Sequence, residues 1–134
     1  MRHIRALLQG EPIPESALQS GAAAEIAVAK YLESQGFALI GRNIRVGRLE
    51  IDLIVRDGPA VAIVEVRTRG PKSYQRGLDS ITAQKRKRVR HAGEQLWRSR
   101  FSKNPTLQRM RFDAASVVFL PGGEIQIDYV IAAF

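Results

Sequence analysis

The sequence predicts an α/β domain in which a mixed β-sheet is flanked by helices. Two long segments carry apolar residues at helical spacing, and shorter segments rich in Val, Ile, Leu and Phe lie between and after them. The predicted elements run α-β-β-β-α-β-β along the chain, an order that favours a mixed sheet with helices packed on it. At 134 residues the chain is long enough for one hydrophobic core and too short for two domains.

The ends of the chain set the expected domain boundaries. The N-terminal stretch MRHIRALLQGEPIPE has two early arginines but only the short apolar run IRALL, so it lacks the apolar core of a secretory signal. We therefore expect residues 1–19 to form a flexible tail or arm and residues 20–134 to form a single domain. No apolar run approaches the roughly 18 residues of a membrane span. These features predict a cytoplasmic protein without a membrane partner.

The first helix is expected in SGAAAEIAVAKYLESQGF. Ser20 can cap its start, and Gly36 can end it as the residue after the cap. Its apolar stripe is expected to contain Ala22, Ile26, Ala29 and Leu32. Glu25 lies three positions after Ala22 and four before Ala29, so the pattern points an acid inward. The alternative is a glutamate that reaches solvent or pairs with an arginine.

Short β-rich pieces, FALI and NIRV, precede a predicted hairpin made of LEIDLIV, a turn at Asp57-Gly58-Pro59, and AVAIVEVRT. Strand alternation places four apolar residues on one face of the first strand and two acids on the other. The first set is Leu49, Ile51, Leu53 and Val55; the second is Glu50 and Asp52 together with Ile54. On the returning strand, Val61, Ile63, Glu65 and Arg67 share a face.

The register of this hairpin decides how close Asp52 and Glu65 come. A two-residue loop at Asp57-Gly58 places Asp52 opposite Ile63 and diagonal to Glu65, about 7–8 Å away between Cα atoms. A neighbouring register of the same parity places Asp52 directly opposite Glu65. The two acids share a face in both cases, and only a one-residue slip would separate them.

A loop, RGPKSYQRG, leads to a second predicted helix, SITAQKRKRVRHAGEQLWRS. Its inward stripe is expected to contain Ile81, Lys85, Val89, Ala92 and Leu96, while Arg86, Lys87 and Arg90 look outward. Lys85 therefore occupies an apolar-face position and either faces the acids or covers apolar surface with its stem.

Two further strands are predicted in RFDAASVVFL and EIQIDYVIAAF, on either side of a Pro121-Gly122-Gly123 turn. We expect Asp113 to belong to the fold, and Leu96 and Trp97 to belong to the core.

The charge is segregated along the chain. From Arg67 to Arg111 there are 14 Lys and Arg against Asp79 and Glu94, a balance of +12, whereas the remaining residues have 7 against 11, or −4. Such a basic half favours a polyanionic partner, above all nucleic acid. The alternatives are a solvated surface and an anionic membrane, although no large apolar face accompanies the charges.

The acids suggest a hard metal ion. The chain has no cysteine and only two isolated histidines, so a bound metal would have oxygen ligands. Asp52 and Glu65 are suitable ligands for Mg²⁺ or Mn²⁺, and the carbonyl of Val66 can complete the set. Glu25 can serve a second ion or its water shell, and Arg67 can neutralise charge in a transition state. The alternative is that Asp52 and Glu65 are edge-strand charges that discourage aggregation.

Several co-linear motifs carry a family resemblance. They are GxxxE (Gly21, Glu25), AxYLxxxG (Ala29 to Gly36), NxR (Asn43, Arg45), EIDLI (Glu50 to Ile54), VEVRxR (Val64 to Arg69), Lys85, RFD (Arg111 to Asp113) and the terminal AF. With them the chain resembles the PD-(D/E)XK restriction-endonuclease-like superfamily, its small Holliday-junction-resolvase-like members, and most narrowly the YraN-type bacterial family. The resemblance runs from about Gly21 to Phe134.

The resemblance implies a restriction-endonuclease-like core, Mg²⁺ as cofactor, and branched or otherwise non-standard DNA as substrate. We expect Glu25, Asp52, Glu65 and Arg67 to be the catalytic residues, joined by Lys85 if its side chain faces inward and supplies an ammonium from the helix. One position departs from the superfamily, because Arg67 stands where a lysine is usual. Arginine keeps the charge but is bulkier and does not place a compact ammonium beside a water molecule.

These observations leave three functions open: a Mg²⁺-dependent endonuclease, a nucleic-acid-binding module weakened in catalysis by Arg67, and a basic partner of RNA. We expect DNA rather than RNA, and a two-fold dimer if the substrate is a junction. The expected nucleic-acid contacts are Arg69, Lys72, Tyr74, Arg76, Arg86, Lys87 and Arg90.

Overall fold

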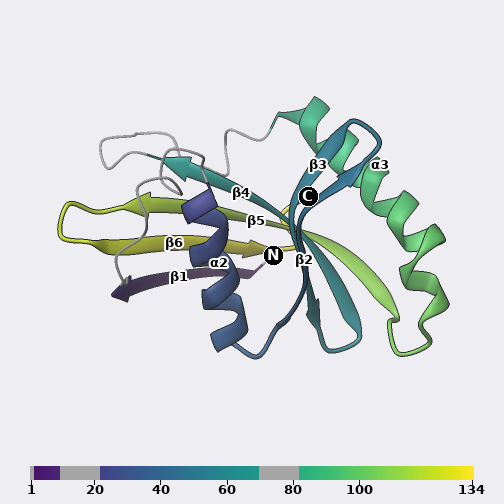
Figure 1. Ribbon diagram of the computed structural model, residues 1–134, viewed down its shortest axis with the longest axis horizontal. Helices are drawn as coiled ribbons and strands as arrows, with labels where there is room; N and C mark the ends of the chain where they lie inside the picture. The colour runs from purple at the N-terminus through teal and green to yellow at the C-terminus, as the bar shows by residue number, and fades with distance from the viewer. Residues whose placement is uncertain (1, 10–21, 70–81) are drawn as a thin grey trace.

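A computed structural model describes residues 2–9, 22–69 and 82–134 of the chain (Figure 1). Six strands form one sheet in the order β1-β6-β5-β4-β3-β2, in which β4 and β5 run parallel and the other neighbours antiparallel. The strands are β1 (Arg2–Gln9), β2 (Ala38–Val46), β3 (Leu49–Asp57), β4 (Ala60–Arg69), β5 (Arg109–Phe119) and β6 (Glu124–Ile131). The helices are α2 (Ala22–Ser34) and α3 (Ala83–Ser99), with a short 3-10 turn, η2 (Phe101–Lys103), after α3.

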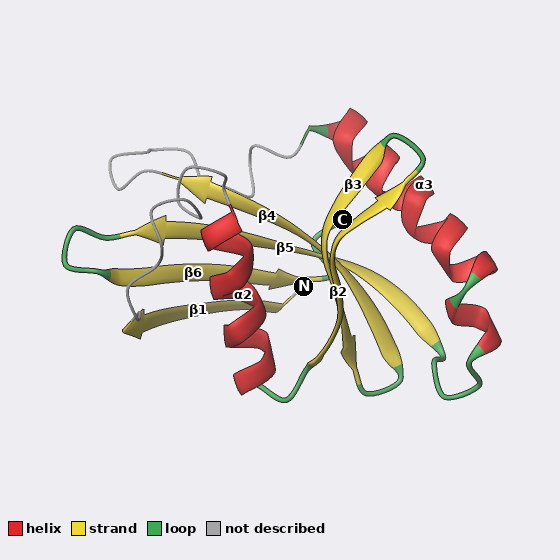
Figure 2. Ribbon diagram, in the orientation of Figure 1, coloured by secondary structure: helices red, strands yellow, loops and turns green. Residues whose placement is uncertain are grey.

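The predicted fold class is confirmed, because the structure is an α/β domain with a mixed sheet that matches a restriction-endonuclease-like core. Figure 2 shows the two helices beside different parts of the sheet. Alternate residues of β4 serve two clusters: Ala62 and Val64 pack with α2, whereas Val61 and Ile63 pack with α3. The central strands are therefore covered on both faces. Among the described helices, none is long and apolar enough to cross a membrane.

The N-terminal residues differ from expectation. Residues 2–9 form β1, which pairs with β6 along its whole length, and Arg5 Nε donates a hydrogen bond to Asp128 Oδ1 at 2.7 Å. Ile4, Ala6 and Leu8 pack against the α2 cluster, while the residues between them are exposed. The prediction of a tail is thus wrong for residues 2–9, because a short alternating strand was interpreted only as a weak apolar run; residues 10–19 lie outside the described part of the chain.

The β3–β4 hairpin settles the register question. Asp57 pairs with Ala60, so Gly58 and Pro59 form the two-residue loop, with Gly58 at φ +57°. The expected Asp57-Gly58 loop is therefore wrong by one residue. Leu53 lies opposite Val64, and the same register continued by one residue brings Asp52 to the level of Glu65. The two acids share a face, as predicted.

Beyond that point β3 and β4 diverge, as Figure 1 shows. The ladder between them ends at Leu53 and Val64, although β3 begins at Leu49 and β4 continues to Arg69. Ile51 consequently packs with the α3 cluster, whereas Leu53 packs with the α2 cluster. The expectation that the alternating apolar residues of β3 line one common core face is corrected by this divergence.

The ends of the helices follow local sequence signals. Gly36, at φ +93°, ends α2, and the Phe37 and Gly36 amides donate to the carbonyls of Leu32 and Glu33, a Schellman motif. The predicted cap Ser20 lies outside the described residues. The core side of α2 differs from the predicted stripe, since Ala22 and Ile26 are only half-buried. Its buried residues are Ala23, Ala24, Ala27, Val28, Ala29, Tyr31 and Leu32.

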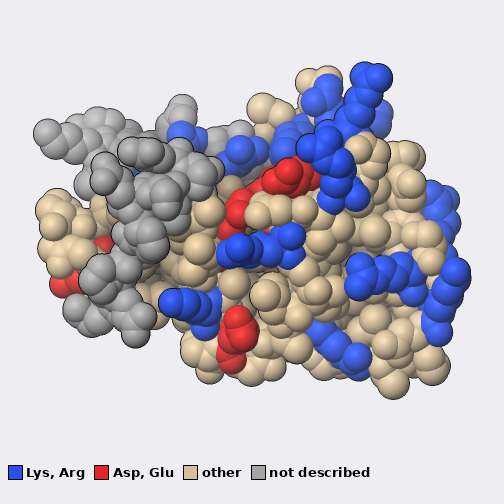
Figure 3. Space-filling model, in the orientation of Figure 1, with Lys and Arg blue, Asp and Glu red and all other residues tan. Residues whose placement is uncertain are grey.

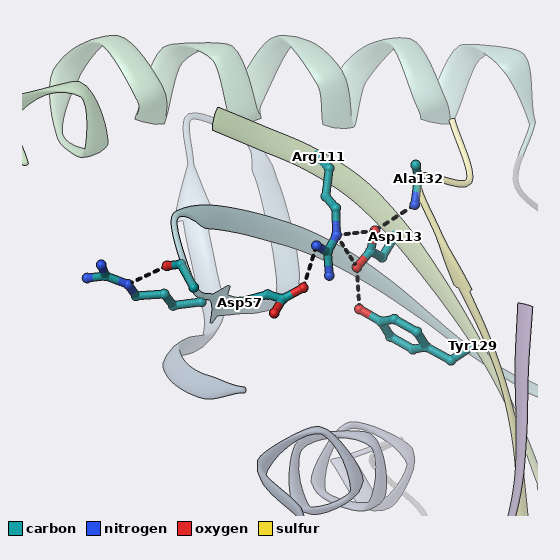
Figure 4. A network of polar contacts seen from close by, with 7 residues as sticks. Asp57, Arg111, Asp113, Tyr129 and Ala132 are labelled. Carbon is teal, nitrogen blue, oxygen red and sulfur yellow. Dashed lines mark hydrogen bonds and ion pairs between the residues drawn. The ribbon is translucent and has the colours of Figure 1, made fainter. Parts of the chain in front are cut away.

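Asp113 belongs to the fold, as expected. It is fully buried and accepts hydrogen bonds from the Tyr129 hydroxyl at 2.6 Å, the Ala132 amide at 2.9 Å and Arg111 Nε at 3.1 Å. Arg111 also contacts Asp57 at 2.7 Å, so the network in Figure 4 ties the β3–β4 turn to β5 and β6. Leu96 and Trp97 pack partly buried against the α3 cluster, also as expected.

Candidate functional site

Asp52 and Glu65 lie together where β3 leaves β4. Asp52 Oδ2 accepts a hydrogen bond from the backbone amide of Val66 at 2.8 Å, which fixes the aspartate beside Glu65. Glu65 is only 1% exposed, and its Oε1 has no hydrogen-bond partner among the residues that the structure describes. An ionised carboxylate in such a place is costly unless another group compensates it.

The electrostatics of the pair reflect this burial. Burial, and secondly the neighbouring Asp52, raise the pKa of Glu65 to about 7, against the attraction of Lys85 and Arg67. Burial also raises the pKa of Asp52, although the Val66 amide and the two cations oppose the shift. Two carboxylates that repel each other in a buried site form an environment that a cation would stabilise.

Lys85 faces these acids. Its Nζ lies 3.8 Å from Glu65 Oε2, and its side chain is 29% exposed. Thr82 caps α3 by accepting a hydrogen bond from the Lys85 amide at 3.1 Å, so this lysine lies in the first turn of the helix. The structure thus favours the inward orientation over a lysine that merely covers apolar surface.

Arg67 follows Glu65 by two residues on β4 and is half-buried. Its positive charge lowers the pKa values of both Asp52 and Glu65, which places it near them. Its Nε is buried and has no hydrogen-bond partner in residues 2–9, 22–69 and 82–134. Arg67 therefore keeps a guanidinium donor available beside the acids.

Glu25 reaches the same region from α2. It is held there by Asn43, to which the sequence analysis assigned no role. With its amide nitrogen turned toward the acids, Asn43 donates to Glu25 Oε1 at 3.0 Å and to Glu50 Oε1 at 3.1 Å. Burial and then Asp52 raise the pKa of Glu25, while the bond from Asn43 opposes this. Asn43 has φ +54°, a conformation that asparagine tolerates better than most residues. The NxR motif was the available signal for it.

The donor set fits a divalent cation of the magnesium type. Within the described residues, no group of three or more acidic, histidine or cysteine side chains is arranged to hold a metal ion. Mg²⁺, however, is usually bound by one or two carboxylates and completed by water and phosphate oxygens. Asp52 and the unpartnered oxygen of Glu65 supply that pair. The Val66 carbonyl can join them, because the carbonyl and amide of a strand residue point to the same side, and the amide already faces Asp52.

Basic side chains surround this acidic site. Figure 3 shows acidic groups near the upper middle of the molecule, with Lys and Arg on both sides of them and over α3. Arg69 is half-buried at the end of β4, and Arg86, Lys87 and Arg90 are exposed on α3. The guanidinium groups of Arg86 and Arg90 also lie over the rings of Phe134 and Phe112, at 6.0 and 5.5 Å. The predicted contacts Lys72, Tyr74 and Arg76 fall outside the described residues.

The known proteins to which this chain is similar belong to one family. The profile of the uncharacterised protein family UPF0102 matches residues 24–117. A UPF0102 protein of Sorangium cellulosum is 57% identical over 125 residues, which cover 93% of this chain and 87% of that protein. The UPF0102 protein YraN of Salmonella arizonae is 38% identical over 108 residues, covering 81% and 79%. A UPF0102 protein of Pseudomonas aeruginosa is 34% identical over 123 residues, covering 90% and 95%.

Proposed function

Because the chain belongs to the UPF0102 family and has two paired acids beside a lysine, we propose that it is a Mg²⁺- or Mn²⁺-dependent endonuclease acting on DNA phosphodiesters. The observation that carries this proposal is the buried Glu65, adjacent to Asp52, with an unpartnered carboxylate oxygen.

The contrast with Asp113 supports a functional role for Glu65. Both acids are buried, but Asp113 has three different donors around its two oxygens, as a structural carboxylate requires. Within the described part of the chain, Glu65 has Lys85 at 3.8 Å as its one ion-pair partner, and its other oxygen has none. A buried acid left incompletely paired is destabilising for the fold, and a bound cation would compensate it.

Each residue of the site has a role in this proposal. Asp52, Glu65 and the Val66 carbonyl would hold the ion, which when bound activates water and stabilises charge on the phosphoryl oxygens. Lys85 places an ammonium at the site from α3, and so compensates for Arg67 at the strand position where a lysine is usual. Arg67 is suited to a bidentate contact with a phosphate. Glu25, held by Asn43, orients water at the edge of the site.

A second candidate function rests on Arg67. An arginine at this position can hold a phosphate without supporting hydrolysis, and the protein would then be a binding module for branched DNA. Both candidates use DNA in the cytoplasm, and both are compatible with a homodimer on a junction. They differ in whether the protein needs a divalent ion to act on DNA.

The test is cleavage of labelled duplex, flap and four-way-junction DNA in the presence of Mg²⁺ or Mn²⁺. Asp52→Ala and Glu65→Ala should abolish cleavage, while Glu124→Ala, which removes an acid at the β5–β6 turn, should leave it intact. If only Arg67→Lys cleaves, the native site is disarmed at one position. If neither the native protein nor Arg67→Lys cleaves any of the substrates, and DNA binding persists in chelator, the binding-module function is correct.

A further inference from the structure

A groove of about 1020 Å³ lies between the β2–β3 turn and α3. Val46, Arg48 and Leu49 form one wall, and Lys87, Arg88 and His91 are on the other. Figure 1 shows the tip of the β2–β3 hairpin reaching toward α3, which forms the second wall. The groove thus exists because β2 and β3 extend past the end of the β3–β4 ladder.

Its charge suits a polyanion. Four Lys or Arg side chains line it, from both walls, against the single acid Glu94. Arg48 and Arg88 are exposed and were not among the nucleic-acid contacts expected from the sequence. Cations on opposite walls can contact successive phosphates of one strand lying between them.

The groove also begins where the candidate site ends. Leu49 immediately precedes Glu50 on β3, and Gln84, another lining residue, immediately precedes Lys85 on α3. From Gln84 to Gln95 the helical wall is about 17 Å long at about 1.5 Å per residue. A strand bound at the acids therefore has a continuous basic path along α3.

We propose that this groove binds a single strand of nucleic acid that continues from the scissile phosphodiester, so that the substrate must have an unpaired strand at the site. The inference rests on the proposed function and specifies its substrate class. Apolar residues also line the groove, Val46, Leu49 and Ala92, and they suit exposed sugars and unstacked bases. A duplex keeps its bases stacked inside and presents mainly phosphates, so it cannot use this apolar lining.

The experiment measures binding of a labelled short oligothymidine in chelator over a series of salt concentrations. The test variant is Arg48→Ala/Arg88→Ala. The matched control is Arg98→Ala/Lys103→Ala, which removes the same charge from exposed positions outside the groove. Loss of two phosphate contacts should reduce the slope of log K against log salt by about 1.4, at about 0.7 per contact on a single strand. The control should reduce it much less, and thermal melting should show both variants folded.

Two further binding measurements separate a single strand from a duplex and DNA from RNA. The groove variant should weaken binding of a duplex of equal length no more than the control does, and oligothymidine should bind more tightly than oligouridine. The groove assignment would be overturned if both double variants lost the same affinity for oligothymidine, or if the groove variant lost as much affinity for duplex as for single strand. A preference for oligouridine would show that the bound strand is not DNA. Asp52→Asn should still bind oligothymidine in chelator. Because this assay measures binding and no cleavage, it tests the groove independently of the endonuclease proposal.

Discussion

Lys85 Nζ on α3 lies 3.8 Å from Glu65 Oε2 on β4, so the helix supplies an ammonium to an acid whose own strand supplies a guanidinium. The two cations are not equivalent. Arg67 presents a planar group suited to phosphate, whereas Lys85 presents a compact charge that can lie beside a carboxylate and a water molecule. We therefore expect the loss of Lys85 and the loss of Arg67 to have different effects.

Lys85→Met should reduce the cleavage rate about 10²–10³-fold at saturating metal, a loss typical of removing one charge-stabilising donor from an active site. Lys85→Arg should recover part of the rate, because the charge remains while its shape changes. Single-turnover cleavage of a flap substrate is the measurement. Lys103→Met, which removes an exposed lysine from η2, is the control. A wild-type rate in Lys85→Met would remove this lysine from the catalytic set.

Glu65→Gln should stabilise the metal-free protein at neutral and alkaline pH. The folded-state pKa of Glu65 is about 7 and its ordinary value is 4.5, so across that window the folded chain binds a proton that the unfolded chain releases. Stability of the native protein therefore falls as the pH rises from 4.5 to about 7, and then levels off. Glutamine does not titrate, so the stability gained by the variant should grow through the same window, up to roughly 3 kcal/mol.

The measurement is urea unfolding in chelator from about pH 4 to about pH 8, roughly the span of this titration. Adding Mg²⁺ at the upper end should stabilise the native protein and leave Glu65→Gln largely unchanged. Glu124→Gln controls for the loss of any one carboxylate. A constant difference between native protein and Glu65→Gln across the whole range would show that this acid is not perturbed by folding.

Asn43 permits a test that separates backbone conformation from hydrogen bonding. Asn43→Gly tolerates the positive φ and removes the amide that bridges Glu25 and Glu50, whereas Asn43→Ala removes the amide and adds about 1–2 kcal/mol of backbone strain. We expect the two variants to lose Mg²⁺ affinity equally, but Asn43→Ala to be less stable. Calorimetric Mg²⁺ titration and urea unfolding measure the two effects. Unchanged Mg²⁺ affinity in Asn43→Gly would limit Asn43 to a structural role.

Much of the site could be predicted because it depends on local periodicity. Strand alternation placed Asp52 and Glu65 on one face, and helical spacing placed Lys85 toward them. The loop position in the hairpin could not be fixed, since Asp57, Gly58 and Pro59 are all good turn residues and the choice between registers depends on packing across the whole sheet.

Other features arise only from tertiary structure. Residues 2–9 form a strand on the edge of β6, and the short alternation of Ile4, Ala6 and Leu8 does not by itself reveal that partner. The bridge from Asn43 to two acids joins α2, β2 and β3, and the basic groove joins the β2–β3 turn to α3. The sequence pattern indicated which acids and cations would meet at the candidate site, but not the contacts that hold them in place.

The half-buried Asp52 and the fully buried Asp113 should respond to the same substitution in opposite ways. Asp113→Asn leaves Arg111 with Asp57 alone of its two acidic partners and turns an amide toward the Tyr129 and Ala132 donors, and should destabilise the protein by about 3 kcal/mol. Asp52→Asn removes a carboxylate that repels Glu65, and its side-chain oxygen can still accept from Val66, so stability in chelator should be unchanged or greater. Urea unfolding of both variants in chelator measures the contrast. If Asp52→Asn proved as destabilising as Asp113→Asn, Asp52 would be part of the scaffold, and its pairing with Glu65 would not indicate a metal ion.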